Sequence, residues 1–211
     1  MLGKLEKRRR FFASPYALYG DRVPKPGLWR AVLGLPEHAP LLLDIGCGKG
    51  EFAVYMAQQH PEWLVIGMER RADRLATGCR LAAEAHLQNV YFWHGDALNI
   101  EATFVPAEVS VIWLNYPDPY PKRRHEKHRL LHPKFLRLYA RVLAPQGELY
   151  FRTDDSAFYE YALEKLTTEG WKVLFATPNL QPGEAEAPAY FETEFRQRKG
   201  GTIHYIHAQR P

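Results

Sequence analysis

The chain has 211 residues, of which 46% are hydrophobic, so its length and composition predict one domain with a sizeable core. Lys and Arg number 28 against 24 Asp and Glu, and this net charge of +4 only weakly indicates a polyanionic partner. The apolar runs are too short for the ~18 residues of a membrane span. Two Cys in unrelated contexts argue against a disulfide scaffold and favour a reducing, cytoplasmic compartment.

The chain divides into an irregular segment and a regular one. Residues 1–40 carry five Pro and the basic cluster 4–10, which predicts an irregular, basic N-terminal arm. Residues 41–211 predict a single domain in which apolar runs alternate with helical periodicity. The predicted helices lie between Gly50 and Pro61, at 71–86, after Pro133 and at 156–169. The predicted strands are 41–45, 64–69, 90–93, 109–114, 147–152, 171–176 and 201–207. This alternation predicts an α/β fold with a mostly parallel, seven-stranded sheet and helices on both faces.

A glycine-rich loop with acidic neighbours follows the first of these strands. It reads Asp44-Ile-Gly46-Cys-Gly48-Lys-Gly50 and opens a helix, so the glycines let the backbone approach a ligand closely. An acid here would repel a pyrophosphate, and Asp44 therefore favours a ligand with a cationic head, such as S-adenosylmethionine, over a dinucleotide. Glu69 ends the second strand, where a carboxylate can accept hydrogen bonds from both hydroxyls of a ribose. The alternative is a turn whose acids only cap helices.

An acid and a dense basic run follow the predicted strand 109–114. The stretch reads Asn115-Tyr-Pro-Asp-Pro-Tyr-Pro-Lys-Arg-Arg-His-Glu-Lys-His-Arg129, with Asp118 between two prolines. Ligands bind at the carboxyl ends of strands in open α/β sheets. Asp118 is therefore a candidate for chemistry, and the basic run is a candidate for contacts with nucleic-acid phosphates. The alternatives are a rigid turn at Pro-Asp-Pro and a solvated helix face for the run.

Together these motifs resemble those of the bacterial tRNA (guanine-N7)-methyltransferases, the TrmB family. The match runs from about Leu42 to Ile206 and is most specific at 117–129, since generic class I methyltransferases share the glycine loop but not this run. The resemblance implies a class I S-adenosylmethionine-dependent methyltransferase fold, which is Rossmann-like. It also implies methyl transfer from S-adenosylmethionine to N7 of a guanine in tRNA, in the variable loop, to form 7-methylguanosine. It requires no protein partner and leaves the oligomeric state open.

The resemblance, together with the glycine loop, also implies roles for individual residues. Asp118 would be the catalytic residue, while Lys122 and Asp154 would contact the substrate. Residues expected to hold the cofactor are Asp44, Gly46, Gly48, Gly50, Glu69, Arg71, Asp96, Ala97, Asn115 and Asp118. Residues expected to contact RNA are Arg124, His125, Glu126, Lys127, His128 and Arg129. Guanine N7 already presents a lone pair, so Asp118 would position the base and stabilise its developing charge rather than remove a proton.

One motif near the C-terminus departs from the family pattern. The family has Thr-x-Phe/Tyr-Glu, whereas this chain reads Thr193-Glu-Phe-Arg196, and Arg cannot accept hydrogen bonds. A shift of four residues gives Ala-Tyr-Phe-Glu at 189–192, which recovers the acid and loses the Thr. We therefore expect substrate contacts from Glu192, Thr193 and Arg196, with Glu192 or Glu194 as the source of the missing carboxylate.

A metal site is not expected, and two alternative functions stay open. His125-Glu-Lys-His128 is one residue short of the His-Glu-x-x-His zinc motif. Asp155 is expected to cap the helix at 156–169. Asn-Tyr-Pro-Asp-Pro-Tyr at 115–120 superficially matches the loop of amino-methyltransferases that act on exocyclic amines, although the inserted Asp breaks the match. The second alternative is a non-catalytic RNA-binding protein that retains the methyltransferase fold, motivated by Arg196 in place of Glu.

Overall fold

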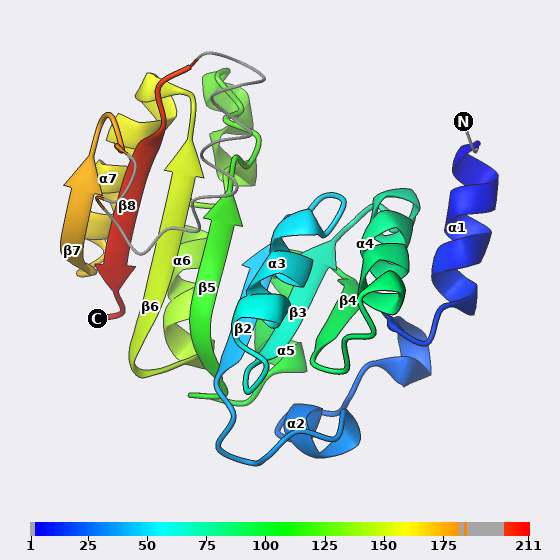
Figure 1. Ribbon diagram of the computed structural model, residues 1–211. Coiled ribbons are helices and arrows are strands. Elements are labelled where there is room, and N and C mark those ends of the chain that lie inside the picture. The colour runs from blue at the N-terminus through cyan, green and yellow to red at the C-terminus, as the bar shows by residue number, and fades with distance from the viewer. Residues whose placement is uncertain (1–2, 182–183, 185–200) are drawn as a thin grey trace.

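An eight-stranded sheet runs through the centre of the computed structural model, which describes residues 3–181, 184 and 201–211 (Figure 1). The strand order is β1-β4-β3-β2-β5-β6-β8-β7. The pairs among β1 to β6 are parallel, whereas β8 runs antiparallel to both β6 and β7. The strands are β1 (Ala17–Leu18), β2 (Leu41–Ile45), β3 (Leu64–Glu69), β4 (Val90–His94), β5 (Val109–Asn115), β6 (Leu143–Thr153), β7 (Lys172–Thr177) and β8 (His204–Gln209).

Helices cover both faces of this sheet and enclose two apolar cores (Figure 1). The helices of one face are α1 (Lys4–Ala13), α3 (Glu51–Gln59) and α4 (Ala72–Glu84). Those of the other face are α2 (Trp29–Val32), α5 (Ile100–Thr103), α6 (Pro133–Val142) and α7 (Ser156–Thr168). The short 3-10 helices are η1 (Gly20–Arg22), η2 (Ala97–Asn99) and η3 (Arg123–His128). None of the helices in the described part of the chain is long and apolar enough to cross a membrane.

The central elements form because their apolar side chains match the period of each element. β2 reads Leu-Leu-Leu-Asp-Ile and is buried along its whole length, as expected for a parallel strand covered by helices on both sides. In α6, Phe135, Leu136, Tyr139 and Val142 recur at the spacing of one helix face and pack into the core. Pro133 occupies the first turn of that helix, where a missing N–H leaves no hydrogen bond unmade.

The α/β architecture is confirmed and each of the seven predicted strands has a counterpart, although the last one, predicted at 201–207, is His204–Gln209; three further features differ from the prediction. The sheet has an eighth strand, because β1 pairs with β4. Residues 1–40 are not irregular throughout, since α1 and β1 form there and the Phe11 side chain fixes α1 to the core. β6 begins four residues earlier than expected, because Leu143 pairs with Val109 ahead of an irregularity in the ladder.

The strand order reverses at the middle of the sheet. The chain places β3 and β4 on one side of β2, and β5 and β6 on the other. The carboxyl ends of these parallel strands meet at the upper edge in Figure 1, so the loops after them converge there. Open α/β sheets bind ligands in the crevice at such a point. The acids Asp44, Glu69, Asp96 and Asp118 all lie at or just after these strand ends.

Candidate functional site

A cavity of about 200 Å³ opens at this edge of the sheet. Its walls come from the ends of β2 and β3, the segments after β4 and β5, and the start of α6. The predicted site residues that line it are Gly46, Glu69, Asp96, Ala97, Asp118 and His128. The structure therefore joins part of the glycine loop, two of its acidic partners and the Pro-Asp-Pro loop in one site.

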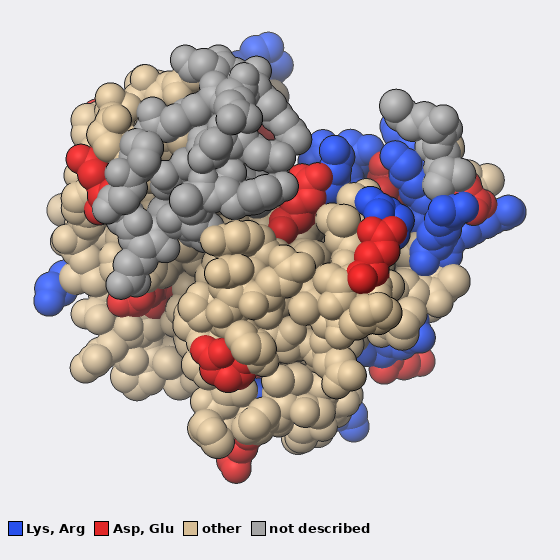
Figure 2. All heavy atoms as spheres, in the orientation of Figure 1, with Lys and Arg blue, Asp and Glu red and all other residues tan. Residues whose placement is uncertain are grey.

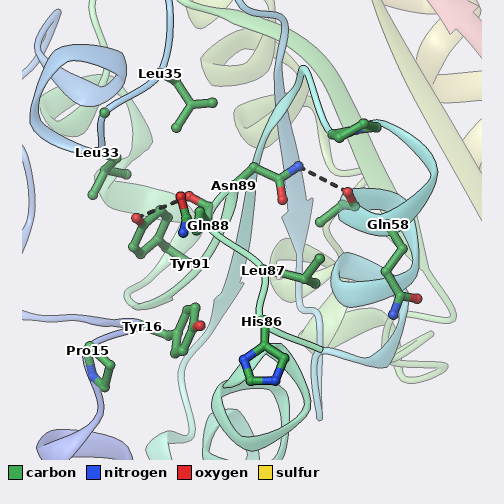
Figure 3. Close-up of a pocket in the computed structure, with 13 residues that line it drawn as sticks. Pro15, Tyr16, Leu33, Leu35, Gln58, His86, Leu87, Gln88, Asn89 and Tyr91 are labelled. Atoms are coloured by element: carbon green, nitrogen blue, oxygen red, sulfur yellow. Dashed lines mark hydrogen bonds between the residues drawn. The ribbon is translucent and has the colours of Figure 1, made fainter. Parts of the chain in front are cut away.

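A larger cavity, of about 760 Å³, lies at the opposite edge, where β1 and β4 begin (Figure 3). Tyr16, Tyr91 and leucine side chains surround it, and no Asp, Glu, Lys or Arg is among the described residues of its lining. The amide nitrogen of Asn89 already donates to three backbone carbonyl groups, at 3.0 to 3.1 Å. This cavity offers few groups for chemistry, so the smaller cavity at the carboxyl edge is the candidate active site.

Asp44, near the end of β2, is a buried carboxylate. Its exposed fraction is 1%, and among the described residues neither of its oxygens accepts a hydrogen bond. Burial raises the pKa of Asp44 to about 7; the neighbouring amide of Asn115 opposes this shift and the charge of Glu69 adds to it. The Asn115 amide is close enough to act on Asp44 as a weak donor, but the two groups do not reach good hydrogen-bond geometry, and both polar atoms of the amide lack a well-placed partner within the described chain.

These two buried groups indicate what the site is built to receive. A carboxylate and an amide are rarely buried without hydrogen bonds, because each loses its water and gains nothing in return. Asp44 and Asn115 lie behind the cavity wall, and their chain neighbours Ile45 and Tyr116 form part of that wall. Neither side chain lines the cavity itself, so a ligand with hydrogen-bond donors and a positive charge would satisfy these groups only by reaching past this wall.

Glu69 and Asp96 line the cavity at the ends of β3 and β4. Glu69 accepts a hydrogen bond from the backbone N–H of Arg71 at 3.0 Å, and the Arg74 guanidinium lies 3.9 Å from its other oxygen. Asp96 caps η2 by accepting a backbone N–H at 3.0 Å, and it pairs with Arg70 at 3.2 Å. The neighbouring N–H groups and guanidinium groups fix the orientation of both carboxylates at the edge of the cavity.

Arg71, a predicted cofactor residue, is not part of the cavity lining. Its side chain is exposed, and its guanidinium pairs with Asp73 at 2.9 Å. Arg70 and Arg74 line the cavity instead. The contribution of Arg71 to the site is therefore its backbone N–H, which donates to Glu69.

Glycine is required at different positions of the loop for different reasons. Positive φ angles of 75°, 59° and 77°, which side chains rarely adopt, occur at Gly46, Gly48 and Gly50. Gly46 lines the cavity. At Gly50 a Cβ atom would lie 2.3 Å from the Phe92 ring, so packing against β4 already requires glycine there. Gly95, which lines the cavity after β4, is equally confined, because a Cβ would lie 2.3 Å from the Trp93 indole.

The Pro-Asp-Pro loop extends from the end of β5 and carries backbone strain. Tyr116 and Tyr120, which flank it, have φ angles of 50° and 44°. This left-handed region costs a residue other than glycine about 1–3 kcal/mol. Pro117 and Pro119 restrict their own φ angles, so the segment between the tyrosines is stiff. Asp118 is exposed between them and lines the cavity. Strained backbone is typical of functional sites, which supports a role for this acid.

Arg129 holds this loop in place. Its Nε donates to the Pro119 carbonyl at 2.9 Å, and its Nη2 donates to the Tyr120 carbonyl at 3.1 Å. The guanidinium also lies over the Tyr161 ring of α7, 4.3 Å from the ring centroid. These contacts give the Arg129 side chain a structural role within the protein, and the RNA contact expected of it stays a prediction.

The rest of the basic run is divided between solvent and the cavity. His128 lines the cavity, whereas His125 and Glu126 are partly buried beside it. No group of three or more His, Cys, Asp or Glu among the described residues is arranged to hold a metal ion. The exposed cations at and before η3 are Lys122, Arg123, Arg124 and Lys127.

The segment after β6 separates two neighbouring acids. Asp155 caps α7 as the sequence predicts, since its Oδ1 accepts the N–H of Phe158 at 2.7 Å. Asp154 is exposed at the carboxyl end of β6, the edge at which the cavity opens. The remaining predicted substrate residues lie outside the described part of the chain: Glu192, Thr193 and Arg196.

Sequence reasoning missed several residues that build the site. Lys134 and Phe135, at the start of α6, line the cavity, but their spacing is that of an ordinary helix face and gives no signal. Arg152, near the end of β6, does not line the cavity, but it is a second unpredicted feature: it is fully buried, with its guanidinium 4.8 Å from the centroid of the Trp113 ring. A single Arg inside an apolar strand is a signal that could have found it, because a buried charge needs a specific reason.

Comparisons with known proteins point to one class of enzyme. A family model described as "Putative methyltransferase" matches residues 38–205. The tRNA (guanine-N(7)-)-methyltransferase of Geobacillus kaustophilus is 36% identical over 202 residues, which cover 94% of this chain and 91% of that relative. The protein of the same name from Levilactobacillus brevis is 36% identical over 194 residues, covering 89% of this chain and 87% of the relative.

Solved structures share the fold at lower identity. The antibiotic-resistance methyltransferase Kmr aligns with a TM-score of 0.60 and 17% identity, over 87% of this chain and 89% of that one. The 16S rRNA methyltransferase KamB aligns with a TM-score of 0.59 and 16% identity, over 81% of this chain and 87% of that one. At these identities the likeness concerns the fold alone.

Proposed function

Because this chain belongs to the tRNA (guanine-N7)-methyltransferase family, we propose that it transfers the methyl group of S-adenosylmethionine to N7 of a guanine in tRNA. The observation that carries this proposal is that Asp118 lines the same cavity as Glu69 and Asp96. A cofactor held by those two acids would lie beside the residue expected to act on the base, next to the exposed cations of η3.

The groups at the carboxyl edge suit S-adenosylmethionine. The carboxylate of Asp44 and the amide of Asn115, both without a hydrogen-bond partner in the described chain, suit a ligand with an ammonium group. Glu69 can accept from ribose hydroxyls, and Asp96 and Ala97 line the part of the cavity next to it, where the family contacts adenine. When bound, this cofactor supplies a methyl group activated by a positively charged sulfur. A dinucleotide suits the site poorly, because Asp44 would repel its pyrophosphate.

Asp118 would position the guanine and stabilise its charge. Guanine N7 has a free lone pair, so no residue has to remove a proton. The purine gains positive charge as N7 is methylated, and a fixed carboxylate beside it lowers the energy of that charge. A carboxylate can also accept hydrogen bonds from N1 and N2 of guanine. The stiff loop and the Arg129 contacts suit a residue that acts through its position.

Exposed cations next to the cavity suit the phosphates of the tRNA. Lys122, Arg124 and Lys127 have the charge and exposure for contacts that position a nucleic acid without reading its sequence. RNA bases are most accessible in loops, where they are unstacked, which agrees with a guanine of the variable loop as the target. We expect further substrate contacts from Asp154, Glu192, Thr193 and Arg196.

Label transfer to unmodified tRNA tests this function directly. The protein is incubated with labelled S-adenosylmethionine and tRNA, and the product is treated with borohydride and aniline, which cleave the chain at 7-methylguanosine. We expect cleavage at a guanine of the variable loop. Methylated adenine would identify an amino-methyltransferase, and tight tRNA binding without label transfer would identify a non-catalytic RNA-binding protein.

Asp118→Ala tests the catalytic assignment. The variant should lose methyl transfer, because the carboxylate beside the base is gone, while it binds tRNA nearly as well as the wild type in a filter-binding assay. Asp21→Ala removes an exposed acid outside the cavity and should transfer label at the wild-type rate. Wild-type turnover by Asp118→Ala would reject the assignment.

A further inference from the structure

The net charge of the chain is concentrated in α1. This helix contains five basic residues and one acidic residue, a net charge of +4, which equals the net charge of the whole chain. The other residues are therefore neutral in sum. Figure 2 shows Lys and Arg gathered over α1, at the upper right of the face in view.

α1 is a fixed part of the domain. Its Phe11 side chain is fully buried, in the core that α1 shares with α3 and α4. The Phe12 and Tyr19 rings meet edge to face at 4.8 Å, and the Tyr19 hydroxyl donates to the Phe12 carbonyl at 2.9 Å. An isolated helix of this length is marginal in water, so these contacts maintain it. The basic side chains are thus carried by a stable support.

The basic surface of α1 continues toward the cofactor edge. A groove of about 300 Å³ runs between α1 and α4 and is lined by Lys7, Arg10 and Arg80. Near the start of α1, Lys4 lies close enough to Asp73 for their charges to interact. Asp73 is in the first turn of α4, which begins just after β3 and its terminal Glu69. The beginning of α1 therefore lies at the same edge as the cavity.

Most cations of α1 lack a neutralising partner. Glu6 pairs with Arg10 at 3.0 Å. Among the described residues Lys7, Arg8 and Arg9 form no ion pair, and Arg8 and Arg9 are exposed. Exposed cations of this kind bind polyanions by releasing their counterions. A lipid surface is a poorer partner, because Leu5 is the one large apolar side chain that α1, described in full, exposes.

We propose that α1 binds the phosphate backbone of the tRNA, as a second grip opposite the cations of η3; this rests on the function proposed above. η3 follows β5 on one side of the cavity, and α1 packs against α4 on the other side, where β3 and β4 lie. The cavity therefore lies between two basic surfaces. An extended polyanion that contacts both surfaces would cross the cavity mouth and present its bases there.

The salt dependence of tRNA binding tests this surface. Arg8→Gln and Arg9→Gln are combined in one variant, and the dissociation constant for unmodified tRNA is measured between about 50 and 200 mM salt. The slope of log affinity against log salt should fall by about 1 to 2, because each phosphate contact contributes about 0.7 to 0.9 to it. Affinity at the low-salt end should fall roughly tenfold, because the lost phosphate contacts no longer release counterions.

Two further variants control for charge and folding. Lys25→Gln combined with Lys172→Gln also removes two exposed cations, but from the opposite edge, ahead of α2 and at the start of β7. This control should keep the wild-type slope. Glu6→Gln frees Arg10 and adds one net positive charge to α1, so it should steepen the slope. A midpoint temperature of thermal unfolding equal to that of the wild type shows that a variant is folded.

An unchanged slope in the folded Arg8 and Arg9 variant would overturn the proposal. The same variant is also tested for binding to vesicles of anionic phospholipid. If it loses vesicle binding while its tRNA affinity stays at the wild-type value, α1 is assigned to a lipid surface and the proposal is wrong. The test is separate from that of the activity. If no 7-methylguanosine is formed but the slope falls as expected, the proposed reaction is wrong and the RNA-binding surface stands.

Discussion

Single residues at the carboxyl edge have environments and backbone conformations that are unfavourable in themselves. Asp44 is buried without a hydrogen-bond partner among the described residues, and Tyr116 and Tyr120 have left-handed backbone. Both features lower the stability of the fold, so they persist only because the surrounding core compensates for them. Perturbed carboxylates of this kind occur most often at functional sites, which connects the cost in stability to ligand binding.

Asp44→Asn should stabilise the protein without ligand. The pKa of Asp44 is raised to about 7 from an ordinary value near ~4, so the folded state holds the proton more tightly than the unfolded state. The stability from this group is present at low pH and is lost as the pH rises from about 4 to about 7. Asn does not ionise, so Asp44→Asn does not lose this stability. Chemical denaturation near pH 8 should give the variant a free energy of unfolding up to about 4 kcal/mol higher than that of the wild type.

The same carboxylate should make the affinity for S-adenosylmethionine depend on pH. A cationic ligand favours the ionised form, so calorimetry should show wild-type affinity rising between about pH 5.5 and 8. Asp44→Asn should bind more weakly and with a flatter profile, whereas Asp21→Asn, an exposed acid outside the cavity, should retain the wild-type profile. Parallel profiles for wild type and Asp44→Asn would mean that this acid does not face the ligand.

Arg129→Gln should lower the rate of methyl transfer with little effect on tRNA affinity. The change removes the two hydrogen bonds to the Pro119 and Tyr120 carbonyls. A displacement of about 1 Å can cost roughly 100-fold in rate, so the single-turnover rate at saturating tRNA should fall roughly 10- to 100-fold. Arg129→Lys should restore only part of it, because Lys lacks the planar fork of donors.

Lys127→Gln is the matched variant from the same basic run, since Lys127 is exposed. It should weaken tRNA binding and reduce the salt slope by about 1, whereas Arg129→Gln should leave that slope unchanged. A reduced slope in Arg129→Gln would instead identify Arg129 as a phosphate contact.

At the scale of elements, the active-site loop depends on a helix far along the chain. The Arg129 guanidinium bonds to the loop on one side and lies over Tyr161 of α7 on the other. α7 in turn is capped by Asp155, whose side chain accepts a free N–H of the first turn. The position of Asp118 is therefore coupled to how well α7 is formed.

Asp155→Ala should destabilise α7 and the fold. Loss of an N-cap side chain costs about 1 kcal/mol, with a range of roughly 0.5 to 2. Urea unfolding followed by circular dichroism measures the change in the free energy of unfolding. Glu160→Ala, an exposed acid on the same helix, should stay within about 0.5 kcal/mol of the wild type. Equal effects of the two changes would show that the cap contributes nothing beyond its charge.

At the scale of the whole molecule, the N-terminal arm belongs to the same core as the sheet. β1 extends the sheet beside β4, and Phe11 packs with the helices of one face. The composition of residues 1–40 does not predict this, because five Pro and a basic cluster dominate a segment in which two aromatic rings, Phe11 and Trp29, are buried and two residues pair with β4. The arm should therefore unfold together with the domain.

Phe11→Ala should lower the stability of the whole protein by about 3 kcal/mol or more, since a large buried ring leaves a cavity. Denaturant unfolding should remain a single transition that different probes report at the same midpoint. Leu5→Ala, at an exposed position of the same helix, should leave the midpoint unchanged. A separate early transition in Phe11→Ala would show that the arm folds independently.

Much of the sheet could be predicted because buried parallel strands are continuous apolar runs, as in Leu-Leu-Leu-Asp-Ile of β2. The four acids could be placed together because each lies at or just after a strand end. Arg129 could not be placed, because an Arg within a basic run has the same local sequence whether it faces phosphate or, as here, two carbonyls and a ring. Such inward contacts depend on tertiary packing, which spacing along the chain does not encode.

The fluorescence of Trp93 should report whether a ligand occupies the cavity. The indole is 4% exposed and packs so closely against Gly95 that no Cβ would fit between them, and Gly95 forms part of the cavity wall. A ligand seated against that wall changes the surroundings of the fluorophore on the other side of a single glycine. Cofactor binding can therefore be followed by tryptophan emission on the unmodified chain, with no dye attached and no residue replaced.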